Sequence, residues 1–278
     1  MNSPYGPSRR CAVLGSPIAH SLSPRLHSAA YEFLGLDWEY GLHEVTESEL
    51  PAFLDGLDPS WRGLSLTMPL KEVALECVDE ASAMATTVSA VNTILLENDG
   101  RRIGDNTDVP GMVAALEEHW IGEPSYGAVI GGGATARSAI ATLSALTDHV
   151  EVFVRTPSRA GPLQQVATDL RVSCQVRPWE ERQSALSAPL ILSTTPPGGT
   201  DDIADQVPRS PAVLLDVTYA PWPTALAAAW EEAGGTVVSG LDVLIHQAVF
   251  QVVAMTGLDV PVSVLRTAGE TALAERAG

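Results

Sequence analysis

Lys71, in the stretch LTMPLK, is the only lysine among the 16 lysines and arginines of this chain. An arginine effectively never loses its proton, whereas burial and neighbouring charges can bring a lysine ammonium close to neutrality. The retained lysine therefore indicates a residue that exchanges protons; chance survival of one lysine is the alternative. Ser65 and Thr67 precede it at the end of an apolar run, and Pro69 ends that run. The placement predicts a ligand cleft, because α/β proteins bind ligands at the carboxyl ends of their strands.

A second polar stretch, GDNTD, ends in Asp108. A carboxylate beside the lysine would hold its amine in place. The alternative is a polar turn that caps a helix expected from about Pro110. The pattern of the sequence changes here, so we also expect a domain boundary.

Near the N-terminus, the stretch GSPIAHSLSPRLH places Ser21 and Ser23 after an expected strand and before an expected helix. Ser23 is predicted to be the N-cap, with Pro24 in the first helical position. Capping needs only one hydroxyl, so the pair could also hold a carboxylate or several hydroxyl groups. His20 and His27 are expected at the surface or in capping roles.

The stretch YGAVIGGGATARSAIATL predicts a strand, a glycine turn and a helix. Gly131, Gly133 and Ala136 fit the spacing of a dinucleotide-binding turn, in which the pyrophosphate lies on the N–H groups at the start of the helix. A plain structural turn, or a site for another nucleotide-like ligand, is the alternative.

The next strand ends in FVRTPSR, where NAD-binding proteins usually offer an acidic residue to the ribose. Arg155 and Arg159 flank Thr156 instead, and two guanidinium groups suit the 2′-phosphate of NADP. A solvated basic loop is the alternative, but it is less expected in so acidic a chain.

The chain has 278 residues, a formal net charge of −18 and a pI of about 4.5. This charge argues against nucleic acid and anionic membranes as partners. No apolar run is long enough to span a membrane, and the N-terminus lacks the pattern of a signal peptide, so we expect a cytoplasmic protein. Three widely spaced cysteines without metal-ligand spacing are expected to be reduced thiols in the core.

Short β-rich runs alternate with helical ones, which predicts an α/β protein with mainly parallel sheets and helices on their faces. Strands are expected at 11–15, 38–45, 63–67, 126–131, 150–155, 190–195, 212–218 and 236–240. Helices are expected at 24–34, 135–146 and 224–233, and a hairpin over 90–104 turns at Asn98–Gly100. We expect a substrate domain at 1–108, a Rossmann-like domain at 109–240, and C-terminal helices at 241–278 that pack on the first domain.

Together, SLSP with a following His, LTMPLK, AVNT, GDNTD, GGGATARS, RTPSR, DVTYAPWPT and GLDVLIHQA resemble the shikimate dehydrogenases in order and spacing. The resemblance runs from about Cys11 to about Ala254. It implies reversible, NADPH-dependent reduction of 3-dehydroshikimate to shikimate in aromatic amino-acid biosynthesis. It also implies two domains with a cleft between them, and both monomers and homodimers as assemblies.

The resemblance implies a role for each matching residue, and no metal. Lys71 and Asp108 would be the catalytic pair. The substrate would be bound by Ser21, Ser23, Ser65, Thr67, Asn92, Asp108, Tyr219 and Gln247. The cofactor would be bound by Gly131, Gly132, Gly133, Ala134, Thr135, Ala136, Arg155, Thr156, Arg159, Thr195, Val217 and Gly240.

The chain departs from the family at several positions. Ser65 stands where the family often has Asn, which makes it a weaker substrate contact. Val154 stands where many members have Asn, which puts one adenosine-ribose contact in doubt. Two other functions stay open: a dehydrogenase for quinate or an aminated analogue, and a non-catalytic shikimate sensor.

Overall fold

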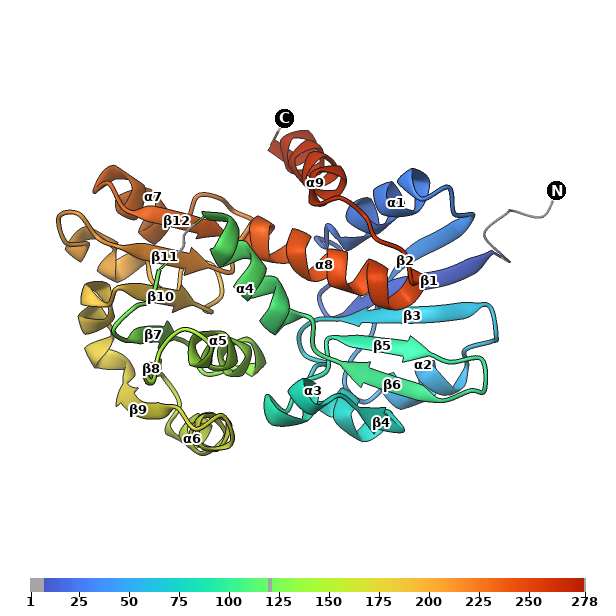
Figure 1. Cartoon of the computed structure of the whole chain (residues 1–278), viewed down its shortest axis with the longest axis horizontal. Helices are drawn as coiled ribbons and strands as arrows, with labels where there is room; N and C mark the ends of the chain where they lie inside the picture. The colour runs from blue at the N-terminus through green and yellow to red at the C-terminus, as the bar shows by residue number, and fades with distance from the viewer. Residues whose placement is uncertain (1–7, 120–121, 278) are drawn as a thin grey trace. The chain divides into compact units, whose positions relative to one another are not determined.

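The computed structural model describes residues 8–119 and 122–277, which form two compact units (Figure 1). The first unit comprises Met1–Thr107 and Leu244–Gly278, and the second comprises Asp108–Val243. Each unit is built around one six-stranded sheet. The predicted α/β class with mainly parallel sheets is confirmed.

The sheet of the first unit has the order β2-β1-β3-β5-β6-β4. Its strands are β1 (Arg9–Gly15), β2 (Trp38–Glu44), β3 (Trp61–Leu66), β4 (Glu80–Ala81), β5 (Thr93–Leu96) and β6 (Arg102–Asp105). β5 pairs antiparallel with both β3 and β6, and the other pairs are parallel. The antiparallel pair β5–β6 is the predicted hairpin.

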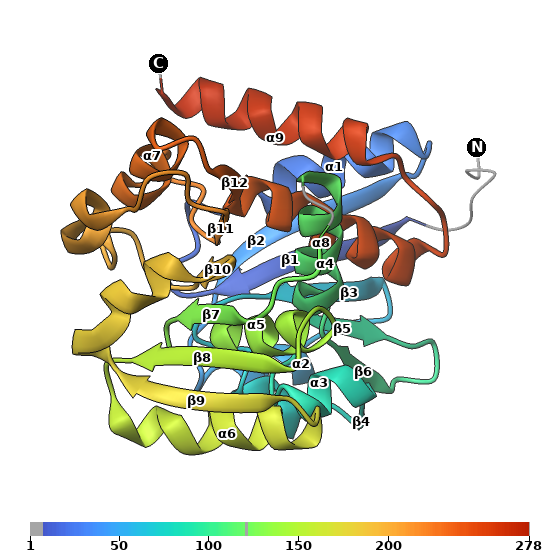
Figure 2. The same cartoon turned by 60° about the vertical axis from the view of Figure 1, so that its left-hand side comes forward.

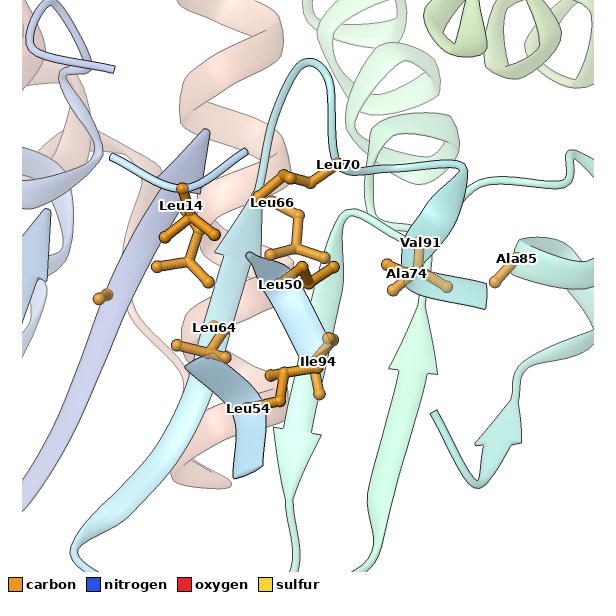
Figure 3. Close-up of a cluster of buried hydrophobic side chains, with 12 residues drawn as sticks. Leu14, Leu50, Leu54, Leu64, Leu66, Leu70, Ala74, Ala85, Val91 and Ile94 are labelled. Atoms are coloured by element: carbon orange, nitrogen blue, oxygen red, sulfur yellow. The ribbon is translucent and has the colours of Figure 1, made fainter. Parts of the chain in front are cut away.

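Alternation along β3 sends its side chains to the two faces of this sheet. Leu64 and Leu66 lie in a leucine-rich cluster that also contains Leu50 and Leu54 of α2 (Leu50–Asp55) (Figure 3). Gly63 and Ser65 lie on the opposite face. A side chain at Gly63 would meet Met255 of α8 (Gly240–Thr256), so glycine allows this helix to approach the sheet.

The opposite face carries the more polar core of the unit. Cys11, Val13, Tyr31, Tyr40 and Met255 cluster there, with residues from β1, β2, α1 (Ser23–Phe33) and α8. The C-terminal helix α9 (Val262–Ala277) packs against α1. The remaining helical segments of the unit are the 3₁₀ helix η1 (Val73–Cys77) and α3 (Ala83–Thr87).

The second unit has the strand order β12-β11-β10-β7-β8-β9, with all pairs parallel (Figure 2). Its strands are β7 (Gly127–Ile130), β8 (His149–Val154), β9 (Ser173–Pro178), β10 (Leu190–Ser193), β11 (Val213–Asp216) and β12 (Thr236–Ser239). Read from β9, this is the strand order of dinucleotide-binding folds, 3-2-1-4-5-6, in which the order of strands along the sheet reverses between the first and the fourth strand. That switch point lies between β7 and β10, so the predicted Rossmann-like fold is confirmed.

Helices cover both faces of this sheet, and its inner strands β7, β10 and β11 are fully buried. On one face are α4 (Asp108–His119), α5 (Ala134–Ser144) and α6 (Ala160–Asp169), each in contact with the next. On the other are α7 (Ala225–Glu232) and two 3₁₀ segments, η3 (Trp179–Ser187) and η4 (Asp201–Gln206). A short 3₁₀ turn, η2 (Pro157–Arg159), follows β8.

The starts of two helices differ from the predictions. Ser23 is the first residue of α1 and not its N-cap, because Leu22 already has helical backbone angles and takes the cap position. Helix α4 begins at Asp108, two residues before the predicted start, with Pro110 in its first turn. Proline is tolerated there because first-turn N–H groups have no partner within the helix.

Two further predictions concern the whole chain. Cys11, Cys77 and Cys174 are free thiols, as expected, but only Cys11 is buried. Burial raises the pKa of the Cys11 thiol to about 11, which keeps it protonated at neutral pH. Among the described residues, no helix is both long and apolar enough to cross a bilayer.

Candidate functional site

Four candidate substrate residues of the first unit, Ser21, Ser23, Ser65 and Thr67, lie at or beyond the carboxyl ends of β1 and β3. The half-buried Ser21 and the buried Ser23 stand side by side at the start of α1, where the Ser23 N–H donates to Ser21 Oγ over 3.2 Å. Arg276 of α9 donates to the carbonyl oxygens of His20 and Ser21. The two hydroxyls are therefore held on a turn that another helix anchors.

His27 does not have the expected surface or capping role. Its side chain is fully buried, stacked on the ring of Tyr40 with centroids 4.0 Å apart, and its Nε2 lies 3.2 Å from Gln251 Oε1. Burial lowers its pKa to about 3, so the ring is neutral at physiological pH. The prediction failed because the residue that contacts it from α8 follows 224 positions later in the chain.

Lys71 lies half-buried in the turn that follows β3. The backbone of this turn is held at three points. The Thr67 N–H donates to the Leu14 carbonyl, the Leu70 N–H to that of Thr67, and the Val91 N–H to that of Lys71. The lone lysine thus stands on a fixed backbone at the carboxyl end of a central strand, as the sequence predicts.

A polar cluster links β5, the end of β6 and α8. Thr107 N–H donates to Asn92 Oδ1 over 2.8 Å, and Asn92 Nδ2 lies 3.0 Å from Thr107 Oγ1 and 3.4 Å from Gln247 Oε1. Asn92 and Thr107 are nearly fully buried. The structure therefore brings together Asn92 and Gln247, two predicted substrate residues 155 positions apart.

Asp108, the other half of the predicted catalytic pair, directly follows Thr107 and is the first residue of the second unit. It is buried in the first turn of α4. Lys71 belongs to the first unit, so the two members of the pair come from different units.

Ser65 connects to residues that the sequence did not single out. It accepts a hydrogen bond from the Tyr40 hydroxyl over 2.6 Å and donates to Gln251 Oε1 over 2.7 Å. Gln251 Nε2 in turn donates to Thr93 Oγ1 over 2.9 Å. One signal could have pointed to Gln251, because it follows Gln247 by four residues and so lies on the same face of α8.

The glycine turn of the second unit lies at the switch point of its sheet, between the ends of β7 and β10. Gly131 has φ +134°, and a side chain there would collide with the Thr194 hydroxyl beyond β10. Gly133 is the N-cap of α5, no side chain caps this helix, and a Cβ at Gly133 would meet no atom within 4 Å. Open space in front of an uncapped helix N-terminus fits a bound pyrophosphate.

Other candidate cofactor residues surround this turn or follow neighbouring strands. Arg155, Thr156 and Arg159 are exposed at the end of β8 and in η2, as a 2′-phosphate site requires. Thr195 follows β10. Gly240 begins α8, and any side chain there would collide with the Val217 carbonyl, so glycine is needed for this close approach.

Tyr219 follows β11, beside a buried carboxylate with a structural role. Asp216 accepts hydrogen bonds from the Thr218 N–H over 3.1 Å and the Thr224 hydroxyl over 2.8 Å. Burial raises the pKa of Asp216 above its usual value, and these hydrogen bonds oppose the rise. The pair of bonds fixes the chain on both sides of Tyr219.

One group of possible metal ligands lies in the described part of the second unit, formed by Glu118, His119 and Asp242. Asp242 also accepts hydrogen bonds from Ser239 N–H and Oγ at the start of α8. This carboxylate therefore already works as a helix cap, and the group lies outside the candidate residues above.

The chain is similar to known proteins along most of its length. Residues 13–94 match the family model described as the shikimate dehydrogenase substrate binding domain. Shikimate dehydrogenase (NADP(+)) of Methanothermobacter thermautotrophicus is 33% identical over 273 residues, covering 95% of this chain and 96% of the relative.

Solved structures give the same result for the fold. Shikimate dehydrogenase of Mycobacterium tuberculosis is 38% identical, with a TM-score of 0.86 over 95% of this chain and 99% of that one. Shikimate 5-dehydrogenase of Thermus thermophilus, solved in complex with NADP(H) and shikimate, is 33% identical with a TM-score of 0.83, covering 95% of this chain and 99% of that one. With similarity of this extent along both units, the chain belongs to the shikimate dehydrogenase family.

Proposed function

We propose that this protein is an NADP-dependent shikimate dehydrogenase, which reversibly reduces 3-dehydroshikimate to shikimate in the shikimate pathway. The observation that carries the proposal is the 33% identity, over 95% of the chain, to an enzyme named for this activity and cofactor. The Thermus thermophilus relative with NADP(H) and shikimate bound supports the same pairing of substrate and cofactor.

Mostly neutral hydrogen-bonding groups bind the substrate, a polyhydroxylated acid. Ser21 and Ser23 hold its carboxylate with their hydroxyls. Its hydroxyl and carbonyl groups are bound by Thr67, Asn92, Asp108 and Gln247, with Tyr219 nearby and Ser65 as a weaker contact. The close grouping of Asn92 and Gln247 supports this part of the proposal, because one ring with several hydroxyls needs several polar groups in one place.

Lys71 transfers the proton. In the direction of reduction its ammonium donates a proton to the carbonyl oxygen of the substrate, and in the direction of oxidation its amine takes that proton back. Its charge also stabilises the developing alkoxide, and Asp108 holds the amine in place. When bound, NADPH supplies the hydride that adds to the carbonyl carbon.

The second unit would hold the cofactor. The turn of Gly131–Ala136 would hold its pyrophosphate, and Arg155, Thr156 and Arg159 would hold its 2′-phosphate. Thr195 and Val217 are further cofactor residues of the proposal, and Gly240 would lie near the nicotinamide. The open space at Gly133 and the uncapped start of α5 support the pyrophosphate position.

Initial rates with shikimate and with quinate, each with NADP and with NAD, test the proposal. The highest kcat/KM is expected for shikimate with NADP. Preference for quinate or for NAD would favour the paralogous dehydrogenase, and tight shikimate binding without turnover would favour the sensor.

The expected location and assembly belong to the same proposal. A cytoplasmic location is part of the proposal, and fractionation of the native cells checks it. A homodimer is the assembly to test against the monomer, by light scattering of the purified chain.

A further inference from the structure

The α8-facing side of the first unit's sheet contains a row of buried polar groups in which each contacts the next. We name it the Tyr40 chain and define it as Tyr40, Ser65, Gln251 and Thr93. The last three are at most 4% exposed and Tyr40 is 8% exposed. Buried polar groups of this kind are normally all hydrogen-bonded, so the donor and acceptor at each step can be worked out.

The orientation of the Gln251 amide is fixed by a backbone carbonyl. Gln251 Nε2 lies 3.3 Å from the Asn92 carbonyl oxygen and 2.9 Å from Thr93 Oγ1. A carbonyl oxygen only accepts, so the opposite orientation would place two acceptors against each other. Gln251 Oε1 must therefore face the other way, toward Ser65 and His27.

On that side, both neighbours have to donate to Gln251 Oε1. Ser65 uses its one proton for this bond, so its oxygen accepts from the Tyr40 hydroxyl. His27 donates from Nε2, which leaves Nδ1 without a proton. That nitrogen is one of two buried side-chain atoms without a hydrogen-bond partner in the described part of the chain. At this buried position, an acceptor nitrogen without a partner costs less free energy than an N–H group without a partner, since orphaned buried N–H groups are rarer.

On the side of Gln251 Nε2, the Tyr40 chain leads through Thr93 to Asn92. Thr93 accepts from Gln251, so its hydroxyl donates to Asn92 Oδ1 over 2.9 Å. The Thr107 N–H, which can only donate, points at the same oxygen. With two donors on Oδ1, Asn92 must turn its Nδ2 toward Gln247 Oε1.

We propose that the residues of the Tyr40 chain are positioning residues, which fix the atoms that Asn92 and Gln247 present to the substrate. The inference rests on the proposed function, in which these two amides bind shikimate. It adds a positioning role for Ser65, whose hydroxyl joins Tyr40 to Gln251, to the weaker substrate contact proposed above. The Tyr40 chain affects shikimate binding through the orientation of Asn92.

A double-mutant cycle tests this proposal with Tyr40→Phe and Thr93→Val, which remove one hydroxyl each from the two ends of the chain. Loss of one buried hydrogen bond predicts a rise in the KM for shikimate of about tenfold for Thr93→Val and about threefold for Tyr40→Phe. The KM for NADP is expected to stay within about twofold. In the double variant, the KM for shikimate should match that of Thr93→Val alone. Without the Thr93 hydroxyl, the Tyr40 chain no longer reaches Asn92, so removal of the Tyr40 hydroxyl has no further effect on the KM.

Tyr31→Phe is the matched control. Tyr31 is also buried and also packs against the His27 ring, but its hydroxyl faces Met255 Sδ at 3.9 Å, outside the Tyr40 chain. Its substitution should leave the KM for shikimate unchanged. An equal effect of Tyr31→Phe and Tyr40→Phe, a normal KM for Thr93→Val, or independent effects that multiply in the double variant would each overturn the proposal.

A second measurement does not depend on activity. Nitrogen-15 NMR of the wild-type protein, with the His27 signals identified by their loss in His27→Asn, should show a proton on Nε2 and none on Nδ1. The opposite tautomer would contradict the derived amide orientation. If the wild type failed to oxidise shikimate but showed the expected tautomer, the proposed function would fail and the hydrogen-bond chain would stand.

Discussion

Replacing Gly133 with serine should separate cofactor binding from stability. Gly133 is the N-cap of α5, its φ of −91° and ψ of −168° suit any residue, and a Cβ there meets no atom within 4 Å. Serine is a better N-cap than glycine, because its hydroxyl oxygen accepts from an N–H of the first helical turn. In the free protein, Gly133→Ser should therefore leave the free energy of unfolding unchanged or raise it by a few tenths of a kcal/mol.

The effect on NADP should be in the opposite direction. The serine side chain occupies the space in front of the helix and competes for the N–H groups that hold the pyrophosphate. A hydrogen bond to a charged group contributes about 1.5–3 kcal/mol, so loss of one raises the Kd for NADP about tenfold to a hundredfold. Isothermal titration of NADP gives the Kd, and urea unfolding of the free protein gives the stability.

Gly131→Ala provides the contrast. Its φ of +134° is unfavourable for alanine and its side chain would collide with Thr194, so both stability and NADP binding should fall. An unchanged Kd in a stable Gly133→Ser variant would refute the reasoning, because the pyrophosphate could then not lie at this turn.

Three other predictions follow from the proposed roles and the buried histidine. Lys71→Ala should lower kcat by about two to four orders of magnitude while shikimate binding weakens little, in steady-state kinetics and equilibrium titration; near-normal turnover would remove lysine as the proton donor. Arg155→Ala should raise the KM for NADP and leave that for NAD nearly unchanged, whereas equal effects on both would discredit the 2′-phosphate assignment. His27, whose pKa of about 3 lies below the usual value near 6.5, binds a proton more readily in the unfolded chain, so stability falls as the pH drops below about 6.5. Between pH 7 and pH 5 the wild type should lose about 2 kcal/mol more than His27→Asn in urea unfolding, and equal losses would show that His27 is not buried in neutral form.

Much of the fold was predictable because it depends on local patterns. Apolar runs with polar ends located most strands, and Asn98–Gly100 marked the hairpin between β5 and β6. Strand β9 was missed because it is a half-exposed edge strand with polar residues, so it lacks the apolar run of a buried strand. The cap of α1 was misplaced because the backbone angles of Leu22, which take that position, cannot be read from residue types.

The chemistry available to this protein can be read from residue types and their order: one lysine after a strand, a glycine turn before a helix, and two arginines where NAD-binding proteins have an acid. These signals are legible because each lies within a few consecutive residues. The burial of His27 and the link that Ser65 makes between Tyr40 and Gln251 appear only in the folded protein. Those contacts join residues 25 to 224 positions apart. The pairing of β2 and β3 with β1 brings Tyr40 to Ser65, and the packing of α8 on the sheet brings Gln251 to Ser65 and His27.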